Sequence, residues 1–366
     1  MKTITLKLDD CQVKLLNKVK SSSGHAAWHS LKRLSSTLGI VVALSGCAAI
    51  QTAGSTQAGR FEFGLIGDLQ YNAEQEAKFP NLVEDLNRAN LAFVVHDGDF
   101  KSGASPCTDE LFYRRRNEFE TSRHPFIYTP GDNEWTDCHR AGADPLERLE
   151  KLRELFFHGD QSLGQRTLTL TRQSNDAKYA RYRENARWVY GDVLFATLHL
   201  VGSNNNLGRT AAMDAEYAER NAANMAWMKE AFDLAKHNRN RAVMLIMQAN
   251  PRFEDTWPPD YLTNLRITVP DPKRPSGYSD FLRALETEVL TFKKPVVLVH
   301  GHTHYFRIDK PLISSKSKRV VENFTRVETV GAPDVNWVRV VADPNDPEVF
   351  TFRHELVKKN VADHLK

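Results

Sequence analysis

Three things are scarce in this sequence of 366 residues: long apolar runs, cysteine and net charge. The apolar run LGIVVA, at positions 38–43, is much shorter than the roughly 20 residues that cross a bilayer, which excludes a membrane-spanning helix there. The formal net charge is only +3, and seven basic against two acidic residues in the first 46 positions account for the excess. The rest of the chain has no basic surplus, so we expect no nucleic-acid-binding surface.

Residues 1–46 have the features of an export signal. Basic residues precede the short apolar run, and small residues precede Cys47 in the stretch LSGC. This stretch resembles the lipobox of bacterial lipoproteins, in which the cysteine becomes the lipid-modified first residue of the mature chain. The residue after Cys47 is Ala48 and not an aspartate, which in such lipoproteins indicates sorting to the outer membrane. We expect an exported protein, anchored by lipid at Cys47 in the outer membrane and facing the periplasm; the alternative is an ordinary signal peptide with an incidental cysteine.

The few cysteines also favour export. Of the four, Cys11 lies in the leader and Cys47 in the lipobox, which leaves Cys107 and Cys138. An even pair of cysteines in an oxidising compartment favours a disulfide bond. We therefore predict a Cys107–Cys138 disulfide, with two buried free thiols as the alternative.

The remainder of the chain reads as one large domain. Residues 47–60 are small and polar, which is typical of a flexible tether. We place the domain at residues 61–356 and a short tail at residues 357–366. No repeat of a fixed period is visible.

Apolar runs typical of strands alternate with periodic runs typical of helices. We predict helices over residues 80–91, 109–122, 144–157 and 212–236. We predict strands in FEFGLIG, LAFVVH, PFIYT, AVMLIMQA and PVVLVHG, a hairpin that turns at Gly191 and Asp192, and three strands after residue 319. This order fits an α/β fold with two packed mixed β-sheets flanked by helices.

Two further segments allow a functional and a purely structural interpretation. Residues 251–279 are proline-rich and long for a plain connection, so they either flank a functional site or form a surface excursion. The amide-rich stretch VGSNNN, residues 201–206, either lines a site or forms a turn.

Five predicted strands each end in a cluster of polar residues. The clusters are GDLQ with Asp68 and Gln70, HDGD with His96, Asp97 and Asp99, GDNE with Asp132 and Asn133, MQANP with Gln248 and Asn250, and GHTH with His302 and His304. Ligands bind beyond the carboxyl ends of strands in open α/β sheets. Carboxylate, amide and imidazole groups are donors suited to Mn, Fe, Zn or Mg. Each cluster alone is weak evidence, and their repetition and order indicate a metal site.

In this order the clusters resemble those of the calcineurin-like metallophosphoesterase superfamily, over residues 61–310. The family pattern is DxH, GDxx, GNH[ED], an isolated histidine and GHxH. GDFK at residues 98–101 and GHTH at residues 301–304 match as they stand. DxH is altered to DLQ and GNHE to GDNE, and the isolated histidine corresponds to Gln248 or to Asn250. The resemblance implies the αββα sandwich of this superfamily.

The resemblance also implies a pair of divalent ions. It assigns Asp68, His304 and, as a weaker ligand, Gln70 to one ion; Asp132, His302 and, as a weaker ligand, Gln248 to the other; and Asp99 to both. Two cations about 3.5–4 Å apart can hold an attacking hydroxide and polarise a phosphoryl group. Because amide oxygen replaces imidazole and Asp132 adds a charge, we expect Mn, Fe or Mg in preference to Zn.

The histidine missing at Asn133 raises the question of where the leaving group obtains its proton. In the superfamily that histidine positions the substrate and protonates the leaving group, and an amide can only orient a phosphate oxygen. His139 is the first candidate to replace it, and Lys101 and Arg140 are candidates to neutralise a phosphate. A plain surface position is an equally good interpretation of each of these three residues. His96 and His124 are weaker candidates for the proton donor.

Taken together, the resemblance implies a metal-dependent phosphoesterase of the bacterial envelope. It would hydrolyse a phosphate mono- or diester of a small phosphorylated substrate with a hydroxide that bridges the two ions. The alternative is a non-catalytic lipoprotein that keeps the fold for binding or structure, because three histidines of the pattern are replaced. The presence of Asp99, His302 and His304 favours the enzyme.

Overall fold

The computed structural model describes residues 59–258 and 275–361, which all belong to the unit formed by residues 58–366. The predicted signal peptide, the predicted lipidation site Cys47 and most of the predicted tether lie outside the described residues, as do residues 259–274 and 362–366. Within the described ranges, no helix is long and apolar enough to cross a membrane.

The first sheet has five strands in the order β12-β11-β1-β2-β3. Its strands are β1 (Phe61–Ile66), β2 (Val94–His96), β3 (Phe126–Tyr128), β11 (Trp337–Ala342) and β12 (Phe350–Glu355). β1, β2 and β3 run parallel, so their carboxyl ends meet at one edge of the sheet. β11 pairs antiparallel with both β1 and β12 and extends the sheet on the other side.

The second sheet has seven strands in the order β4-β5-β6-β7-β8-β10-β9. Its strands are β4 (Thr171–Arg172), β5 (Ala186–Tyr190), β6 (Val193–Thr197), β7 (Ala242–Ile246), β8 (Val296–His300), β9 (Arg307–Asp309) and β10 (Phe324–Glu328). β6, β7, β8 and β10 run parallel. Every residue of β6, β7 and β8 is buried, as expected for central strands covered on both faces.

Four of the five long helices among the described residues begin at side-chain caps that the sequence supplies. The five are α4 (Ala73–Arg88), α5 (Asp109–Phe119), α6 (Pro145–Phe156), α8 (Ala211–His237) and α10 (Ser279–Phe292). Asn72, Thr108, Asp144 and Thr210 cap the first four, each through a side-chain oxygen that accepts a backbone N–H of the first turn. Short segments are α7 (Gly202–Asn205) and the 3₁₀ turns η1 (Thr136–Ala141), η2 (Gln173–Asn175), η3 (Ala177–Tyr179), η4 (Phe253–Thr256) and η5 (Lys358–Asn360).

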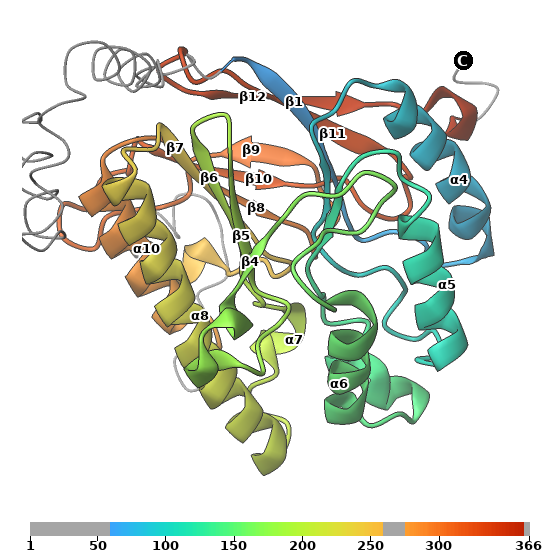
Figure 1. The fold of residues 1–366 in the computed structure, drawn as a ribbon. Helices are drawn as coiled ribbons and strands as arrows, with labels where there is room; N and C mark the ends of the chain where they lie inside the picture. Colours follow the sequence, from blue (N-terminus) through green and yellow to red (C-terminus); the bar gives the residue numbers. More distant parts are fainter. Residues whose placement is uncertain (1–58, 259–274, 362–366) are drawn as a thin grey trace, which may run out of the picture. The chain divides into compact units, whose positions relative to one another are not determined.

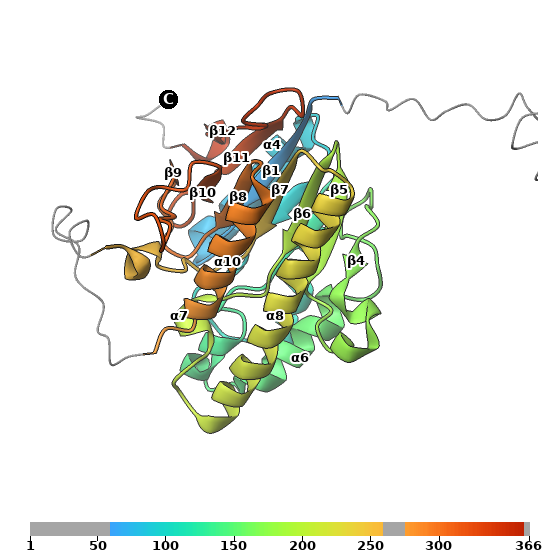
Figure 2. The ribbon, with the colours of Figure 1, turned by 90° about the vertical axis from the view of Figure 1, so that its left-hand side faces the viewer.

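Three apolar clusters hold the layers together. Helices α4, α5 and α6 pack on the first sheet, and α8 and α10 pack on the second (Figures 1 and 2). The third cluster lies between the two sheets and joins Phe63 and Val95 of one to Phe195 and Met244 of the other. The layers therefore run helix, sheet, sheet, helix, and the predicted α/β fold with two packed mixed sheets is confirmed.

Local differences from the predicted elements have physical causes. The helix predicted over residues 80–91 begins earlier, at Ala73, because Asn72 caps it and Pro80 is accommodated inside it. Helix α10 and strand β9 were not predicted, since α10 follows directly on a proline-rich segment and β9 has three residues. The hairpin turn at Gly191 and Asp192 is confirmed by the Tyr190–Val193 pair.

Candidate metal centre

The predicted polar clusters meet at one edge of the molecule. Those led by Asp68, Asp99 and Asp132 follow β1, β2 and β3 of the first sheet, whereas those with Gln248 and His302 follow β7 and β8 of the second. Since β1, β2 and β3 are parallel to one another, as are β7 and β8, their carboxyl ends bring these side chains together. The centre thus lies where the two sheets adjoin.

The backbone at this edge is strained. Five residues of the clusters have positive φ angles: Asp68 (52°), Gln70 (63°), Asp99 (59°), His302 (80°) and His304 (63°). Residues with side chains rarely adopt this left-handed conformation, which costs of order 1–3 kcal/mol each and persists where surrounding structure imposes it. The backbone of Gly131 also packs closely against Asp99, because a Cβ on Gly131 would lie 2.0 Å from Asp99 Oδ1. Such strain marks a site held in a functional geometry.

Asp99, Asp132 and His302 form a set of three possible metal ligands. One ligand atom from each lies within 4.8 Å of the other two. His302 Nδ1 is 3.5 Å from Asp132 Oδ1, and this buried oxygen has no hydrogen-bond partner among the described residues. The other oxygen of Asp132 accepts a hydrogen bond of 2.8 Å from Ser203 Oγ. A buried carboxylate oxygen without a partner is what a bound cation would satisfy.

The electrostatics of the centre also favour a cation. Burial, together with the nearby carboxylates of Asp132 and Glu134, raises the pKa of Asp99 well above its usual range. Burial tends to lower the pKa of His302, but the adjacent carboxylate of Asp132 outweighs burial and raises the pKa to about 9. Both pKa shifts arise in part from neighbouring carboxylates, and bound cations would reduce the repulsion between these negative charges.

Asp68 and His304 lie together beside this triad. His304 Nε2 is 3.4 Å from Asp68 Oδ1, while His304 Nδ1 is 2.9 Å from the carbonyl oxygen of Ala332. The carbonyl fixes the hydrogen on Nδ1 and leaves the lone pair on Nε2, as a metal-binding histidine requires. The hydroxyl of Tyr71 lies 3.2 Å from both Asp68 Oδ1 and His304 Nε2. Tyr71 was not predicted to belong to the site, although it directly follows Gln70 in the first cluster.

The two glutamines are held by different hydrogen bonds. Gln70 Nε2 donates a hydrogen bond of 2.8 Å to Glu118 of α5, and its buried Oε1 has no hydrogen-bond partner among the described residues. Gln248 Oε1 accepts a hydrogen bond of 2.6 Å from Gly202 N, so its Nε2 faces Asp99 Oδ2 at 2.9 Å and His302 Nδ1 at 3.1 Å. An amide nitrogen is no metal ligand in this state. Gln248, and not Asn250, therefore occupies the place of the isolated histidine, and it serves as a hydrogen-bonding support.

A cavity of about 390 Å³ opens over the Asp99–Asp132–His302 triad and the neighbouring His304. The described residues that line it are Tyr71, Asp99, Gly103, Asp132, Asn133, Asp137, Arg140, Ser203, His302 and His304. Through Ser203 and His302 it adjoins a second cavity of about 550 Å³, to which Asn250 and Arg252 contribute. The stretch VGSNNN thus lines the site, and it does so through a left-handed turn over residues 203–206.

Of the residues predicted to bind phosphate or to supply the proton, Arg140 lines the cavity, whereas Lys101 and His139 do not. Arg140 lines the cavity, and its Nη1 lies 2.9 Å from Asp137 Oδ2. Lys101 is fully buried and donates to the carbonyl oxygens of Ser102 and Asn133, both at 2.7 Å, so it supports the loop and does not reach the cavity. His139 is exposed, with Nδ1 3.0 Å from the carbonyl oxygen of Thr136, and does not line the cavity.

The other two histidine candidates are structural. His96 is buried, its Nδ1 accepts a hydrogen bond from Gly98 N, and burial lowers its pKa to about 3. His124 is also buried, with Nε2 3.0 Å from the carbonyl oxygen of Leu86 in α4. Among the residues that the structure describes, His302 and His304 are the histidines that line the cavity.

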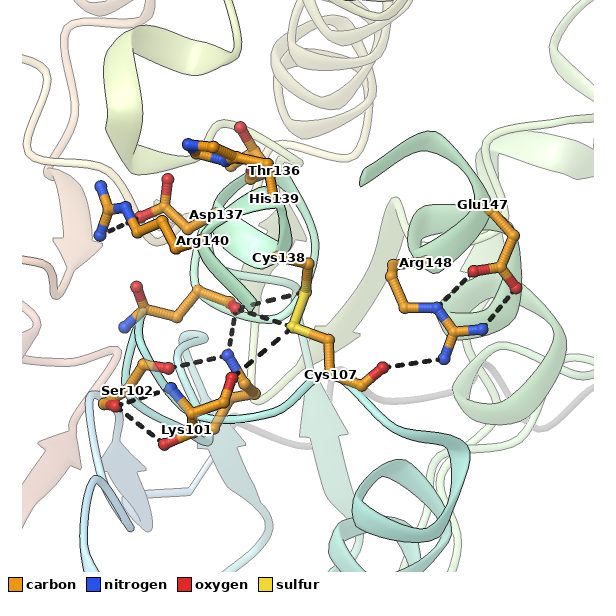
Figure 3. The surroundings of a disulfide bond; sticks show 12 residues. Lys101, Ser102, Cys107, Thr136, Asp137, Cys138, His139, Arg140, Glu147 and Arg148 are labelled. Atoms are coloured by element: carbon orange, nitrogen blue, oxygen red, sulfur yellow. Dashed lines mark hydrogen bonds and ion pairs between the residues drawn. A yellow bond between two sulfur atoms is a disulfide. The ribbon is translucent and has the colours of Figure 1, made fainter. Parts of the chain in front are cut away.

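The predicted disulfide between Cys107 and Cys138 is confirmed. Figure 3 shows that it joins the loop of Lys101 and Ser102, which follows Asp99, to the turn that carries Asp137 and Arg140. Both cysteines are buried. The disulfide therefore ties the loop after β2 to the loop after β3, two loops that each supply a carboxylate to the centre.

The sequence of the chain matches a known protein family. The sequence profile of the calcineurin-like phosphoesterases matches residues 61–306, about two thirds of the chain. The chain belongs to the calcineurin-like phosphoesterase family. Members of this family usually bind pairs of metal ions, and the matched region of this phosphoesterase contains every residue that forms the centre.

Several solved structures resemble this chain at low sequence identity. Purple acid phosphatase PPD1 from yellow lupin is 11% identical, with a TM-score of 0.48 over 84% of this chain and 53% of its own. PhoD is 11% identical, with a TM-score of 0.47 over 78% of this chain and 64% of its own. The 5'-nucleotidase of Candida albicans is 12% identical, with a TM-score of 0.40 over 80% and 50%. This chain thus spans half to two thirds of these chains, and no curated protein matches it.

Proposed function

We propose that the protein is a metal-dependent phosphoesterase that hydrolyses a phosphate mono- or diester. The observation that carries this proposal is the convergence of Asp99, Asp132 and His302 within 4.8 Å at the carboxyl ends of strands from both sheets. Asp132 Oδ1 is buried without a hydrogen-bond partner among the described residues, and an ion would satisfy it. The substrate would be a small phosphorylated molecule.

The side chains around the cavity suit a phosphate ester. Cations held here would generate a nucleophile from water near neutral pH and polarise the phosphoryl group. Arg140 is half exposed at the cavity and can donate to phosphate oxygens. Asn133 also lines the cavity, and its Nδ2 donates a hydrogen bond of 3.1 Å to Tyr71 Oη, which holds the amide in place. With Asn133 unable to donate a proton as an acid, esters with good leaving groups should react fastest.

The ligand set supports a preference for hard cations. Carboxylate oxygens from Asp68, Asp99 and Asp132 outnumber the two imidazoles of His302 and His304. Neither Gln70 nor Gln248 restores a nitrogen donor. We propose two divalent ions, with Mn, Fe or Mg favoured over Zn, because oxygen-rich sites suit the harder ions.

The setting is proposed on the sequence and on the disulfide. A Cys107–Cys138 bond is stable in an oxidising compartment, which supports export. We propose a protein held in the cell envelope by lipid at Cys47, in the outer membrane and facing the periplasm. The lipid anchor would be its contact with the membrane.

Metal analysis combined with an activity assay tests the function. Purified protein should contain bound metal by elemental analysis and should hydrolyse bis- and mono-nitrophenyl phosphate when Mn²⁺ is added. Asp99→Ala should lower kcat/KM by more than the roughly 10- to 100-fold that loss of an outer-shell partner causes. The exposed Asp346→Ala is the matched control and should match wild type. Protein that holds no metal and turns over neither ester would instead be the non-catalytic lipoprotein.

A further inference from the structure

The hydroxyl of Tyr71 stands at the middle of the group formed by Asp68, Asp99 and His304. Its oxygen is 3.2 Å from Asp68 Oδ1, 3.2 Å from Asp99 Oδ2 and 3.2 Å from His304 Nε2. Asn133 Nδ2 donates to the same oxygen at 3.1 Å. The hydroxyl carries one hydrogen and can donate it to only one acceptor, so with His304 neutral and both carboxylates ionised, acceptor atoms face one another without a hydrogen between them. A cation between these atoms resolves the conflict.

The spacing of the atoms is that of ligands around one ion. Asp68 Oδ1, His304 Nε2 and Tyr71 Oη form a triangle with sides of 3.2, 3.2 and 3.4 Å. Ligands about 2.1 Å from an octahedral ion, at right angles to one another, are about 3.0 Å apart. The three atoms therefore match one face of an octahedron, and Asp99 Oδ2 adds a fourth position next to Tyr71.

Each of the three atoms is aimed at this point by a fixed partner. Asp68 Oδ2 accepts the backbone N–H of His302 at 2.8 Å, which leaves Oδ1 directed toward Tyr71. The carbonyl oxygen of Ala332 holds Nδ1 of His304, which leaves Nε2 free to bind. The backbone N–H of Tyr71 donates to Gln75 Oε1 at 2.9 Å, and its ring packs edge-on against His304 with centroids 5.1 Å apart. The first turn of α4 thus positions the tyrosine.

We propose that Tyr71 is a ligand of the first metal ion and replaces the histidine that is missing at position 70. Gln70 is held by Glu118 and does not line the cavity, whereas the neighbouring side chain supplies an oxygen at the vacant corner of the ligand set. The phenol oxygen is the atom that would contact the ion, next to Asp68 Oδ1 and His304 Nε2. This inference rests on the proposed function in one respect, that the centre binds ions.

Ion counting with Tyr71→Phe tests the assignment, since phenylalanine keeps the ring against His304 and removes only the oxygen. Wild type should bind two ions, and Tyr71→Phe should bind one tightly, with the affinity for the lost ion reduced at least about tenfold. Titration of metal-free wild type with Mg²⁺ or Mn²⁺ should also produce an ultraviolet difference band from the perturbed tyrosine ring, and Tyr71→Phe should not show it. Tyr113→Phe, which alters an exposed tyrosine of α5, is the matched control.

The outcomes separate this inference from the proposed function. If Tyr71→Phe and wild type have the same ion count, affinities and difference spectrum, Tyr71 is not a ligand, and the proposed phosphoesterase stands without it. If wild type binds no ion at all, both the inference and the proposed function are overturned. Loss of one ion together with the difference band in Tyr71→Phe, and in no control, supports the assignment.

Discussion

The two ion positions respond differently to the same substitution. Each has a glutamine where the family pattern has a histidine: Gln70 at the first position and Gln248 at the second. At the first, Gln70 binds Glu118, and the Tyr71 hydroxyl stands among the ligands. At the second, Gln248 stays between Asp99, His302 and Gly202 but presents its nitrogen. At the first position, the neighbouring Tyr71 thus supplies a ligand atom in place of the glutamine. At the second, the glutamine itself serves as a hydrogen-bonding support.

The supports around the positions differ as well. The start of α4 holds the first position, because Gln75 of that helix binds the backbone N–H of Tyr71. The second position depends on loops: Asp132 follows β3, and Ser203 belongs to the left-handed turn that lines the cavity. The start of α4 is capped by Asn72, whereas ligand-binding loops belong to the less stable parts of a fold. We therefore expect the first ion to be held more firmly and the second to be more sensitive to changes nearby.

Removal of the disulfide should have the largest effect and should act unevenly on the two positions. The Cys107→Ala/Cys138→Ala double variant opens a crosslink between residues 31 apart, which by the chain-entropy model lowers the free energy of unfolding by about 3–4 kcal/mol. Urea unfolding measures that loss. The crosslink braces the loop that carries Asp132 and also the loop after Asp99, a residue shared by both ions. Both ions should therefore bind more weakly, and the second should lose more affinity than the first. Equal weakening of both ions would contradict the difference in support.

A rise in pH should strengthen binding of the second ion. The pKa of His302 is raised to about 9 in the ion-free protein, so a cation must displace a proton there at neutral pH. Apparent affinity should therefore rise about tenfold for each pH unit between 7 and 9, roughly 100-fold in all, and level off above. Titration of the ion-free protein with Mg²⁺ at several pH values checks this. A flat profile, or one without proton release, would show that His302 does not bind the ion.

Much of the fold could be predicted because its signals are local. Buried runs such as β7 and β8 are continuous apolar stretches, and Asp144 marks the start of α6 in the sequence itself. The meeting of Asp68, Asp99, Asp132, His302 and His304 also followed from local signals, since each comes directly after a strand. Those features required only strand order and the rule that ligands gather at strand ends.

The direction in which a side chain points could not be predicted in the same way. Lys101 and His139 are both close in sequence to ligand residues, yet one is buried against backbone carbonyls and the other is exposed on η1. Gln248 resembles a ligand until its oxygen is seen to bind Gly202, 46 positions earlier in the chain. Tyr71 is placed by the cap of a helix whose start was predicted seven residues too late. These outcomes depend on contacts between distant segments, which no local pattern contains.

Restoring a histidine at each position tests the comparison most directly, with the smallest expected effect. Gln248→His should place an imidazole nitrogen beside His302 and strengthen binding of the second ion by roughly tenfold, or about 1.4 kcal/mol. The gain is limited because the hydrogen bond to Gly202 N is lost. Gln70→His should change binding of the first ion by less than about threefold, because Tyr71 already fills that ligand position and Glu118 holds the side chain at position 70. Calorimetric titration with Mn²⁺ measures both variants. If Gln70→His strengthens the first ion as much as Gln248→His strengthens the second, the first position lacks a ligand too, and the two positions are alike.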